Sequence, residues 1–568
     1  MGIEYFLIAL LFALIINFSD LYAIIKDEKA WTPVNYPPYS IGDDYHYYSS
    51  MNALMQHIQK KFGLLRETNL FLTPPNYLTI GSLLINLPVY YLGMKLFDQR
   101  YSVLFVRIFN AILLFLSISC LLYVLNLNKL LLNDYYIMSL TIMVFLLYPV
   151  SFDIRYLIKR TILFNVLNKK HSDTHAGAND LVRGVIQSTS APVLLLVISY
   201  FVFFIQTSNA ILPLEILLVL NIFLYFVYSI LGSVFFIFVV TINALSYWYL
   251  DIVRLEFLEV IILTFINILF FLLQRKLLSG VVSSQEVFKL EMFSKFSARK
   301  YFYTLLTLLF SLVLFLSFTM DLMLLLLLSA TFFVVFDLLL GDHGGRFWYR
   351  GMLVIYTVFL INYVNDIFYI DMYNYLFYIE LFVLIIYFYT NTLYLYEKKA
   401  KIAVSKKALE LAINYKTDKV IITDSIDLIW YMCLYSNNKM LFVHYSLQGN
   451  GYKRQMSDFI VMLLLLEYSK EEIYEIFNIY NEKTNMSVYS EKNLKRMQLL
   501  LFMVLYKRYN YHMKDDGMLN SNGDFTDAFF DFLDEVYNQS CKYVMSMDKS
   551  IYYIVKREEL LDIGDSIE

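Results

Sequence analysis

The sequence predicts an α-helical polytopic membrane protein, with about 11–13 transmembrane helices followed by a soluble C-terminal α/β domain. Hydrophobic residues make up 59% of the 568 positions, and the mean hydropathy is +0.55, whereas apolar residues form roughly half of an ordinary soluble protein. They gather in runs of about 20, such as 301–320 and 322–340, which match the roughly 30 Å hydrocarbon core of a bilayer. Near residue 398 the pattern changes to polar helices and short apolar strands. We therefore divide the chain into a transmembrane domain, 1–396, and a soluble domain, 397–568.

Spanning helices are expected to fill most of the transmembrane domain. Tyr and Trp stand at the ends of several runs, as at 247–249 and 348–349, and this is the depth where amphipathic rings are favoured. The first run lacks a basic segment and a small-residue cleavage site, which indicates an uncleaved first helix. The expected helices are 3–24, 76–96, 101–126, 134–150, 191–207, 210–230, 231–250, 257–274, 301–320, 321–340, 351–370 and 374–396.

Two connections between these helices, 155–183 and 275–300, are rich in Lys and Arg. The positive-inside rule places both in the cytoplasm. The long first loop, 19–75, then lies outside, and the even number of helices places the C-terminal domain in the cytoplasm.

The C-terminal domain shows a strand, helix, strand pattern. Residues 420–424 (VIITD) and 440–444 (MLFVH) are expected as buried strands around a helix at 425–434, with a third strand at 543–547. This order predicts a small parallel sheet. No G-x-G-x-x-G follows the first strand, so a dinucleotide site is not expected, and the domain is interpreted as an accessory that faces a substrate or a partner.

Composition and motifs exclude several function classes. The net charge of −3 argues against a nucleic-acid partner, because phosphate backbones select strongly basic surfaces. Cys120, Cys433 and Cys541 are far apart, without C-x-x-C spacing, and are expected to be packing residues. The absence of P-loop, H-E-x-x-H and G-x-S-x-G motifs disfavours ATP-driven transport and the common hydrolases.

The first loop carries the strongest candidate for chemistry. Asp43 and Asp44 follow Gly42 and precede Tyr45 and His46. Adjacent carboxylates bind a divalent cation through oxygen, or one removes a proton from a hydroxyl while the other orients it. A turn at the glycine would aim both at one site. The alternative is an ordinary solvated turn.

Short motifs resemble those of the GT-C class of membrane glycosyltransferases. They are the acidic pair in a long external loop, the P-P-x-Y segment at Pro74 and Pro75, and the R-x-x-N-A helix with Arg107 and Asn110. VIITD, MLFVHYS and the late YVMSM segment resemble the α/β domain of some members of the class. The resemblance covers the layout of most of the chain but only short motifs of its sequence.

The resemblance implies transfer of a hexose or pentose from a polyprenyl-phosphate donor to a glycan, lipid or protein acceptor of the cell envelope, in the cytoplasmic membrane. Asp43 and Asp44 would be catalytic, with Mg²⁺ or Mn²⁺ as a possible cofactor, and His46 would bind substrate. The segment 178–192 (ANDLVRGVIQSTSAP) resembles the second site loop of the class. There Arg183 would pair with the donor phosphate, and Asn179 and Asp180 would add substrate contacts.

Two questions stay open at the level of sequence. The charge rule puts Arg183 in the cytoplasm, whereas a site shared with Asp43 needs both outside, where the class usually carries its C-terminal domain too. One miscounted helix before residue 150, such as a re-entrant segment, would remove the conflict. One alternative function is a non-catalytic lipid or polysaccharide transporter or assembly protein, although the sequence shows no paired interrupted helices of the kind that transporters have. Another is a polysaccharide polymerase, but the large loop of such proteins usually lies late in the chain, whereas here it comes first.

Overall fold

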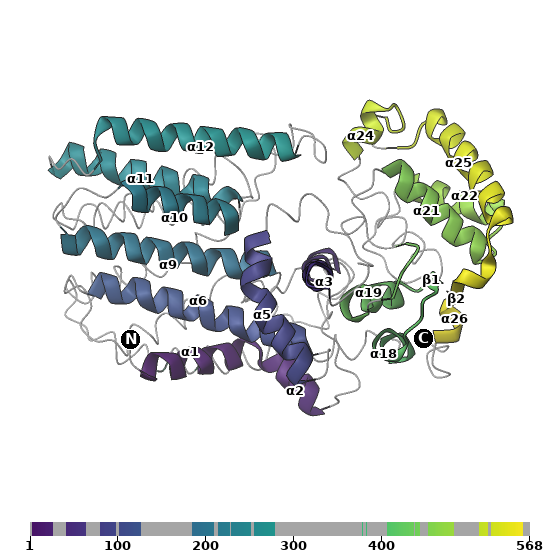
Figure 1. The fold of residues 1–568 in the computed structure, drawn as a ribbon, viewed down its shortest axis with the longest axis horizontal. Coiled ribbons are helices and arrows are strands. Elements are labelled where there is room, and N and C mark those ends of the chain that lie inside the picture. Colours follow the sequence, from purple (N-terminus) through teal and green to yellow (C-terminus); the bar gives the residue numbers. More distant parts are fainter. Residues whose placement is uncertain are drawn as a thin grey trace, which may run out of the picture.

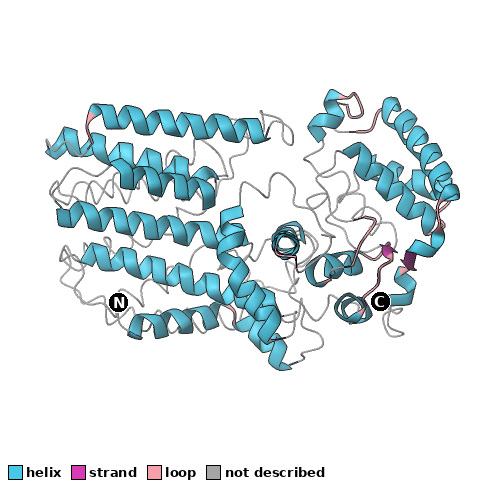
Figure 2. Cartoon of the chain, in the orientation of Figure 1, coloured by secondary structure: helices cyan, strands magenta, loops and turns pink. Residues whose placement is uncertain are grey.

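The computed structural model of the protein is mostly helical, with 82% of its described residues in helices. Figure 2 shows strands only beside the C-terminal helices of the part that is described. The coarse prediction of a helical architecture is therefore confirmed. The structure describes residues 3–26, 41–63, 80–97, 101–126, 185–208, 214–227, 229–250, 255–278, 378, 382, 406–436, 438–442, 452–481, 510–520 and 524–560. The predicted helices at 134–150, 301–320, 321–340 and 351–370 lie outside these residues, as does most of 374–396.

Six helices lie side by side and form a bundle (Figure 1). Each coincides with a predicted apolar segment. The ring centroids of Phe12 and Phe115 lie 5.1 Å apart, where the helix that contains Phe12 packs against the helix that contains Phe115. The helices are α1 (Ile3–Ile16), α6 (Ser102–Asn126), α9 (Val185–Ser208), α10 (Leu214–Val227), α11 (Ser229–Leu250) and α12 (Phe257–Leu278).

The bundle is apolar outside and partly polar inside. On α12, Leu263 and Asn267 are buried, while Phe257 and Phe265 are 81% and 66% exposed. The Asn267 side chain accepts a hydrogen bond of 2.7 Å from the Tyr225 hydroxyl of α10. This is the reverse of a helix on the surface of a water-soluble protein, which turns its apolar stripe inward.

Length and apolar composition decide which of the described helices could cross a membrane. Among the described residues, only Ser102–Leu121 is both long and apolar enough, with a mean hydropathy of 2.2. Shorter apolar stretches occur in α1, α9, α10, α11 and α12. Multiple membrane crossings therefore stay a prediction.

Helix α5 (Ile80–Leu96) does not run alongside the bundle but lies steeply across one end of it (Figure 1). Gly81 permits the crossing, because a Cβ there would lie 2.8 Å from Cα of Val227 at the end of α10. The last turn of α5 reaches the start of α6, where a Cβ on Gly93 would lie 2.9 Å from Cα of Ser102. The described part of the segment predicted as the second spanning helix, 76–96, thus forms a helix that caps the bundle. We call this end of the bundle the junction end.

The first loop contains two helices, α2 (Phe18–Lys26) and α3 (Ile41–Lys61). α2 overlaps the end of the helix expected over 3–24, whereas α3 was not among the expected helices, although a helix is physically allowed there. The physical reason is the position of the prolines, which lie at 33, 37, 38, 74 and 75 and leave 41–61 free to form a helix. α2 packs on the start of α6, where Leu21 and Ile24 contact Leu104.

The C-terminal domain contains the predicted parallel sheet. β1 (Val420–Thr423) pairs in parallel with β2 (Tyr552–Val555), in a register that joins Val420 to Tyr552, and Met440 forms a parallel bridge to Ile421 on the other side. The predicted strand at 420–424 and the helix after it, α19 (Ile426–Tyr435), are confirmed. The strand predicted at 440–444 is represented among the described residues only by the single bridge at Met440, and β2 was not predicted. Ser425 caps α19 by accepting a hydrogen bond from the Leu428 N–H.

The predicted third strand at 543–547 is wrong, because 543–546 form the last turn of helix α25 (Asp527–Ser546). Phe529, Leu533 and Val536 are buried at helical spacing, so one amphipathic helix outweighs the short apolar run at its end. The remaining helices are α18 (Lys406–Asn414), α21 (Tyr452–Leu465), α22 (Lys470–Asn481), α24 (Asn510–Asp515), a 3₁₀ turn (Lys549–Ile551) and α26 (Arg557–Leu560).

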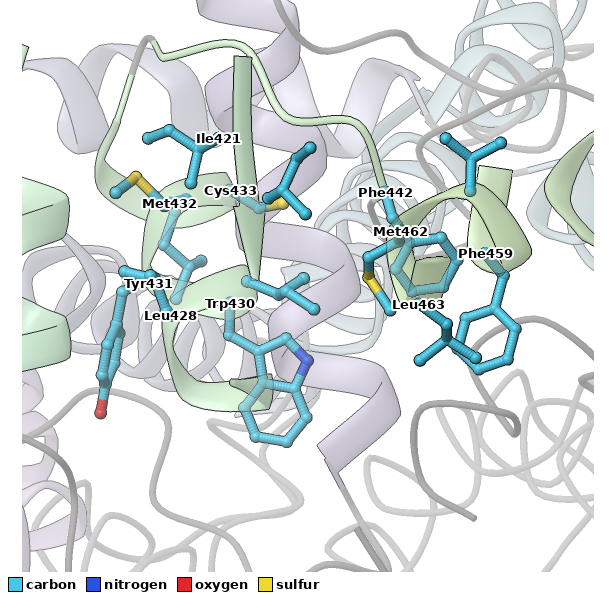
Figure 3. Packing of buried hydrophobic residues seen from close by; sticks show 14 of the residues in the cluster. Ile421, Leu428, Trp430, Tyr431, Met432, Cys433, Phe442, Phe459, Met462 and Leu463 are labelled. Carbon is cyan, nitrogen blue, oxygen red and sulfur yellow. The ribbon is translucent and has the colours of Figure 1, made fainter. Parts of the chain in front are cut away.

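The core of this domain lies between α19, the sheet and α21. Figure 3 shows Ile421 beside Cys433 of α19, and Phe442 against Phe459 of α21, whose ring centroids are 5.5 Å apart. Cys433 is fully buried, which agrees with its expected packing role, whereas Cys120 and Cys541 are only partly buried. The same core continues into α3, α5 and the start of α6 through Tyr48, Leu83 and Val103.

Candidate functional site

Helix α3 lies between the junction end of the bundle and the C-terminal domain (Figure 1). Nine consecutive residues, from Tyr48 to Gln56, are buried, so this stretch of the helix is enclosed on all sides. Four of the nine are polar: Ser49, Ser50, Asn52 and Gln56. A polar helix in such a position needs partners for its side chains, because an unpaired buried polar group costs about 1–3 kcal/mol.

The candidate acids stand at the beginning of this helix. The backbone of Asp43, Asp44 and His46 belongs to the first two turns of α3, while their side chains lie outside the described residues. The predicted turn at Gly42 is wrong, since the backbone there is helical. Successive residues of a helix are about 100° apart around its axis, and acidic residues in a first turn are favoured by the helix dipole.

The second half of α3 contacts the carboxyl end of α19. The Asn52 side chain donates from Nδ2 to the Cys433 carbonyl oxygen at 2.8 Å. The Tyr90 hydroxyl, from α5, donates to the Leu434 carbonyl oxygen at 3.0 Å. Both carbonyls belong to the last turn of α19, whose backbone acceptors have no partner within the helix. Helices α3 and α5 of the N-terminal part therefore complete the hydrogen bonding of a C-terminal helix.

A ring of three hydrogen bonds ties α5, α6 and α9 together beside α3. Asn110 donates to Oδ1 of Asn86 at 2.9 Å, Asn86 donates to Oγ1 of Thr189 at 2.6 Å, and Thr189 donates to Oδ1 of Asn110 at 2.9 Å. All three side chains are at most 1% exposed. Sequence reasoning noticed only Asn110, as part of a motif; the signal for the others was a polar residue inside each apolar helix.

The second candidate segment leads into this region. α9 begins at Val185, and its first turns reach α5 through Thr189 and also contact α3. Asn179, Asp180 and Arg183 precede Val185 in sequence and lie outside the described residues. The structure thus brings the start of α9 and the helix of the acidic pair to the same end of the bundle.

Two further ionisable groups merit description. Burial lowers the pKa of His57 in α3, and the neighbouring Lys60 ammonium lowers it further, which favours the neutral imidazole. Asp424, at the carboxyl end of β1, is 4% exposed and accepts a hydrogen bond of 3.1 Å from the Tyr468 hydroxyl. Carboxyl ends of parallel strands are common ligand positions, and sequence reasoning treated Asp424 only as part of the strand.

Metal ligands were sought throughout the part of the chain that the structure describes. No group of three or more His, Cys, Asp or Glu side chains there is arranged to hold a metal ion. The proposal of a divalent cation therefore concerns only Asp43 and Asp44.

The junction end combines a buried polar helix, a polar ring and the start of α9. No protein-family model matches this chain, and a search of curated proteins finds no match to it.

Proposed function

We propose that the protein is a membrane glycosyltransferase that moves a sugar from a polyprenyl-phosphate donor to a glycan, lipid or protein acceptor of the cell envelope. The observation that carries the proposal is the arrangement of the junction end. There α3, which bears Asp43 and Asp44, lies beside the start of α9, which Arg183 precedes by two residues. A shared site needs these two segments on one side of the membrane.

The path of α5 supports this common side. α2 follows α1 and packs on the start of α6, so the chain leaves and re-enters the bundle at the same end. Since α5 lies across that end, it does not count as a crossing in the proposed topology. Removing one helix before residue 150 from the count places the first loop and Arg183 on the same side of the membrane, as a shared site requires. The charge rule assigns that side to the cytoplasm, whereas the resemblance to the GT-C class favours the outside, and the proposal follows the resemblance.

The inverted polarity of the bundle supports a location in the membrane. A stripe on α12 that includes Phe257, Ile261, Phe265, Ile268 and Leu272 is exposed. In water such a stripe would form a large apolar patch, whereas hydrocarbon tails solvate it well. The proposed location is the cytoplasmic membrane.

The proposed chemistry is direct transfer at the anomeric carbon. One Asp carboxylate accepts the proton of the acceptor hydroxyl as its oxygen attacks that carbon, and the bond from the carbon to the donor phosphate oxygen breaks. Arg183 pairs with the departing phosphate, because a guanidinium offers two parallel donors. A bound Mg²⁺ or Mn²⁺ would add charge stabilisation through oxygen ligands.

Purified protein incubated with radiolabelled polyprenyl-phosphate glucose or mannose and envelope extract tests the proposal. Asp43→Asn and Asp44→Asn should lower transfer at least about a hundredfold for the residue that acts as base, with no change in thermal stability. The helical backbone favours unequal effects of the two substitutions. Glu256→Gln, at the opposite end of the bundle, is the matched control. A wild-type protein that binds and transfers neither sugar would leave the transporter or assembly function ahead.

A further inference from the structure

We propose that the carboxyl end of α19 is a latch through which the C-terminal domain fixes the position of α3, and with it the acidic pair. The latch consists of Asn52 and Tyr90 as donors and the carbonyls of Cys433 and Leu434 as acceptors. The presence of the latch rests on described contacts alone. Its effect on chemistry rests on the proposed function.

The donors and acceptors of the latch are buried, so solvent does not compensate for the loss of one of its hydrogen bonds. Asn52 is 1% exposed, and Tyr90, Cys433 and Leu434 are each fully buried. Water cannot replace a lost donor in such a place without the two domains moving apart. The neighbouring Met432 carbonyl accepts a hydrogen bond of 3.0 Å from the Ser436 N–H of its own domain, whereas the Cys433 and Leu434 carbonyls accept hydrogen bonds from the other domain.

α19 is held firmly at its other end. Ser425 caps it directly after the strand β1, and Leu428, Ile429 and Met432 are at most 1% exposed. The helix is therefore a rigid member of the sheet layer and moves with it. A displacement of the C-terminal domain would pull on α3 and α5 together, because Asn52 and Tyr90 come from those two helices.

The other described hydrogen bonds from α3 to the C-terminal domain are longer. Gln56 reaches the Ser436 carbonyl only at 3.5 Å, and Oγ of Ser49 is buried without a hydrogen-bond partner. The short bond from Asn52 thus stands out among the described hydrogen bonds between α3 and the C-terminal domain. Its loss would free the helix that begins with Asp43 and Asp44.

Hydrogen exchange of the full-length protein in detergent, read by mass spectrometry, tests the latch. Tyr90→Phe removes one hydroxyl and keeps the ring, and Asn52→Leu removes the amide at similar volume. Each should speed exchange in α3 at least about fivefold, the factor that corresponds to about 1 kcal/mol. Tyr91→Phe is the matched control, because Tyr91 is 41% exposed and lies next to Tyr90. Unchanged exchange in both latch variants would overturn the proposal.

A second readout separates positioning from simple loss of fold. At a temperature where circular dichroism shows every variant fully folded, Tyr90→Phe should lower kcat for sugar transfer and leave the KM for the donor unchanged. If the loss of activity in a variant equals the fraction of its protein that is unfolded, the latch only stabilises the fold and does not position α3. If the wild-type protein transfers no sugar, the proposed function fails while the exchange experiment still decides whether the latch exists.

Discussion

Asn110 of α6 donates a hydrogen bond of 2.9 Å to Asn86 of α5, and Thr189 of α9 closes the ring between them. Within the ring each member donates one bond and accepts one, and Asn86 also donates to the Ser82 carbonyl of its own helix at 2.8 Å, so the ring joins three helices. Because α5 lies across the others, this ring fixes the angle at which the cap of the bundle sits.

Breaking the ring should destabilise the protein. Thr189→Val keeps the shape of the side chain but leaves one N–H of the Asn86 amide without its ring acceptor and Oδ1 of Asn110 without its ring donor, which is expected to cost about 1–3 kcal/mol. Thermal unfolding in detergent measures the change. Ser117→Ala is the control, because the buried Ser117 hydroxyl bonds only to the Leu114 carbonyl of its own helix. Equal losses in the two variants would contradict the role assigned to the ring.

Topology can be tested with single cysteines in a background where the three native cysteines are serine. Lys61→Cys on α3 and Ser546→Cys on α25 place exposed thiols on the two parts that meet at the junction end. Both should react with a membrane-impermeant maleimide in intact cells, whereas Glu256→Cys, at the other end of the bundle, should react only after permeabilisation. Opposite behaviour of Lys61→Cys and Ser546→Cys would disprove a common side.

The pH dependence of the C-terminal domain should reflect Asp458 on α21. Burial raises the pKa of this carboxyl, and Arg454, at 3.2 Å, only partly offsets the effect. The folded state therefore binds the proton more tightly than the unfolded state, so this group adds stability as pH falls through its raised pKa toward the ordinary value of about 3.9. Asp458→Asn should raise Tm at pH 7 by roughly 1–4 °C. It should also remove the part of the increase in Tm on acidification that comes from protonation of Asp458. Asp531→Asn, exposed on α25, is the control, and an equal Tm rise there would refute the assignment.

The sequence predicted those helices and strands that a short stretch of the chain specifies by itself. β1 and α19 were identified from short apolar runs in a strand, helix, strand order, and the helices of the bundle from their long apolar segments. The 543–547 strand failed because the buried face of α25, at Phe529, Leu533 and Val536, specifies a helix that continues to Ser546, whereas Tyr543 and Met545 are exposed. α5 was correctly expected as a helix, but its direction depends on Gly81, Gly93 and the Asn86 ring, which are tertiary contacts.

The candidate site was predictable only in outline. Asp43 and Asp44 were recognised as a pair, yet their helical backbone was not, because α3 has neither an apolar stripe nor a long apolar run. Its burial comes from two domains that approach it from opposite sides. Asn52 and Tyr90 could not be recognised at all, since their partners lie more than 300 positions later in the chain.

That separation has a consequence for biosynthesis. Asn52 emerges from the ribosome 381 residues before its acceptor at Cys433, which at roughly 5–20 residues per second corresponds to a wait of about 20–80 s. During this interval the polar face of α3 has no C-terminal helix to cover it. Strand β1 also lacks its partner for a time, because Tyr552, the first residue of β2, is synthesised 129 residues after Thr423, the last residue of β1. The nascent chain therefore exposes unfinished surfaces late in synthesis, and chaperones that recognise them would have their longest access to this protein at that stage.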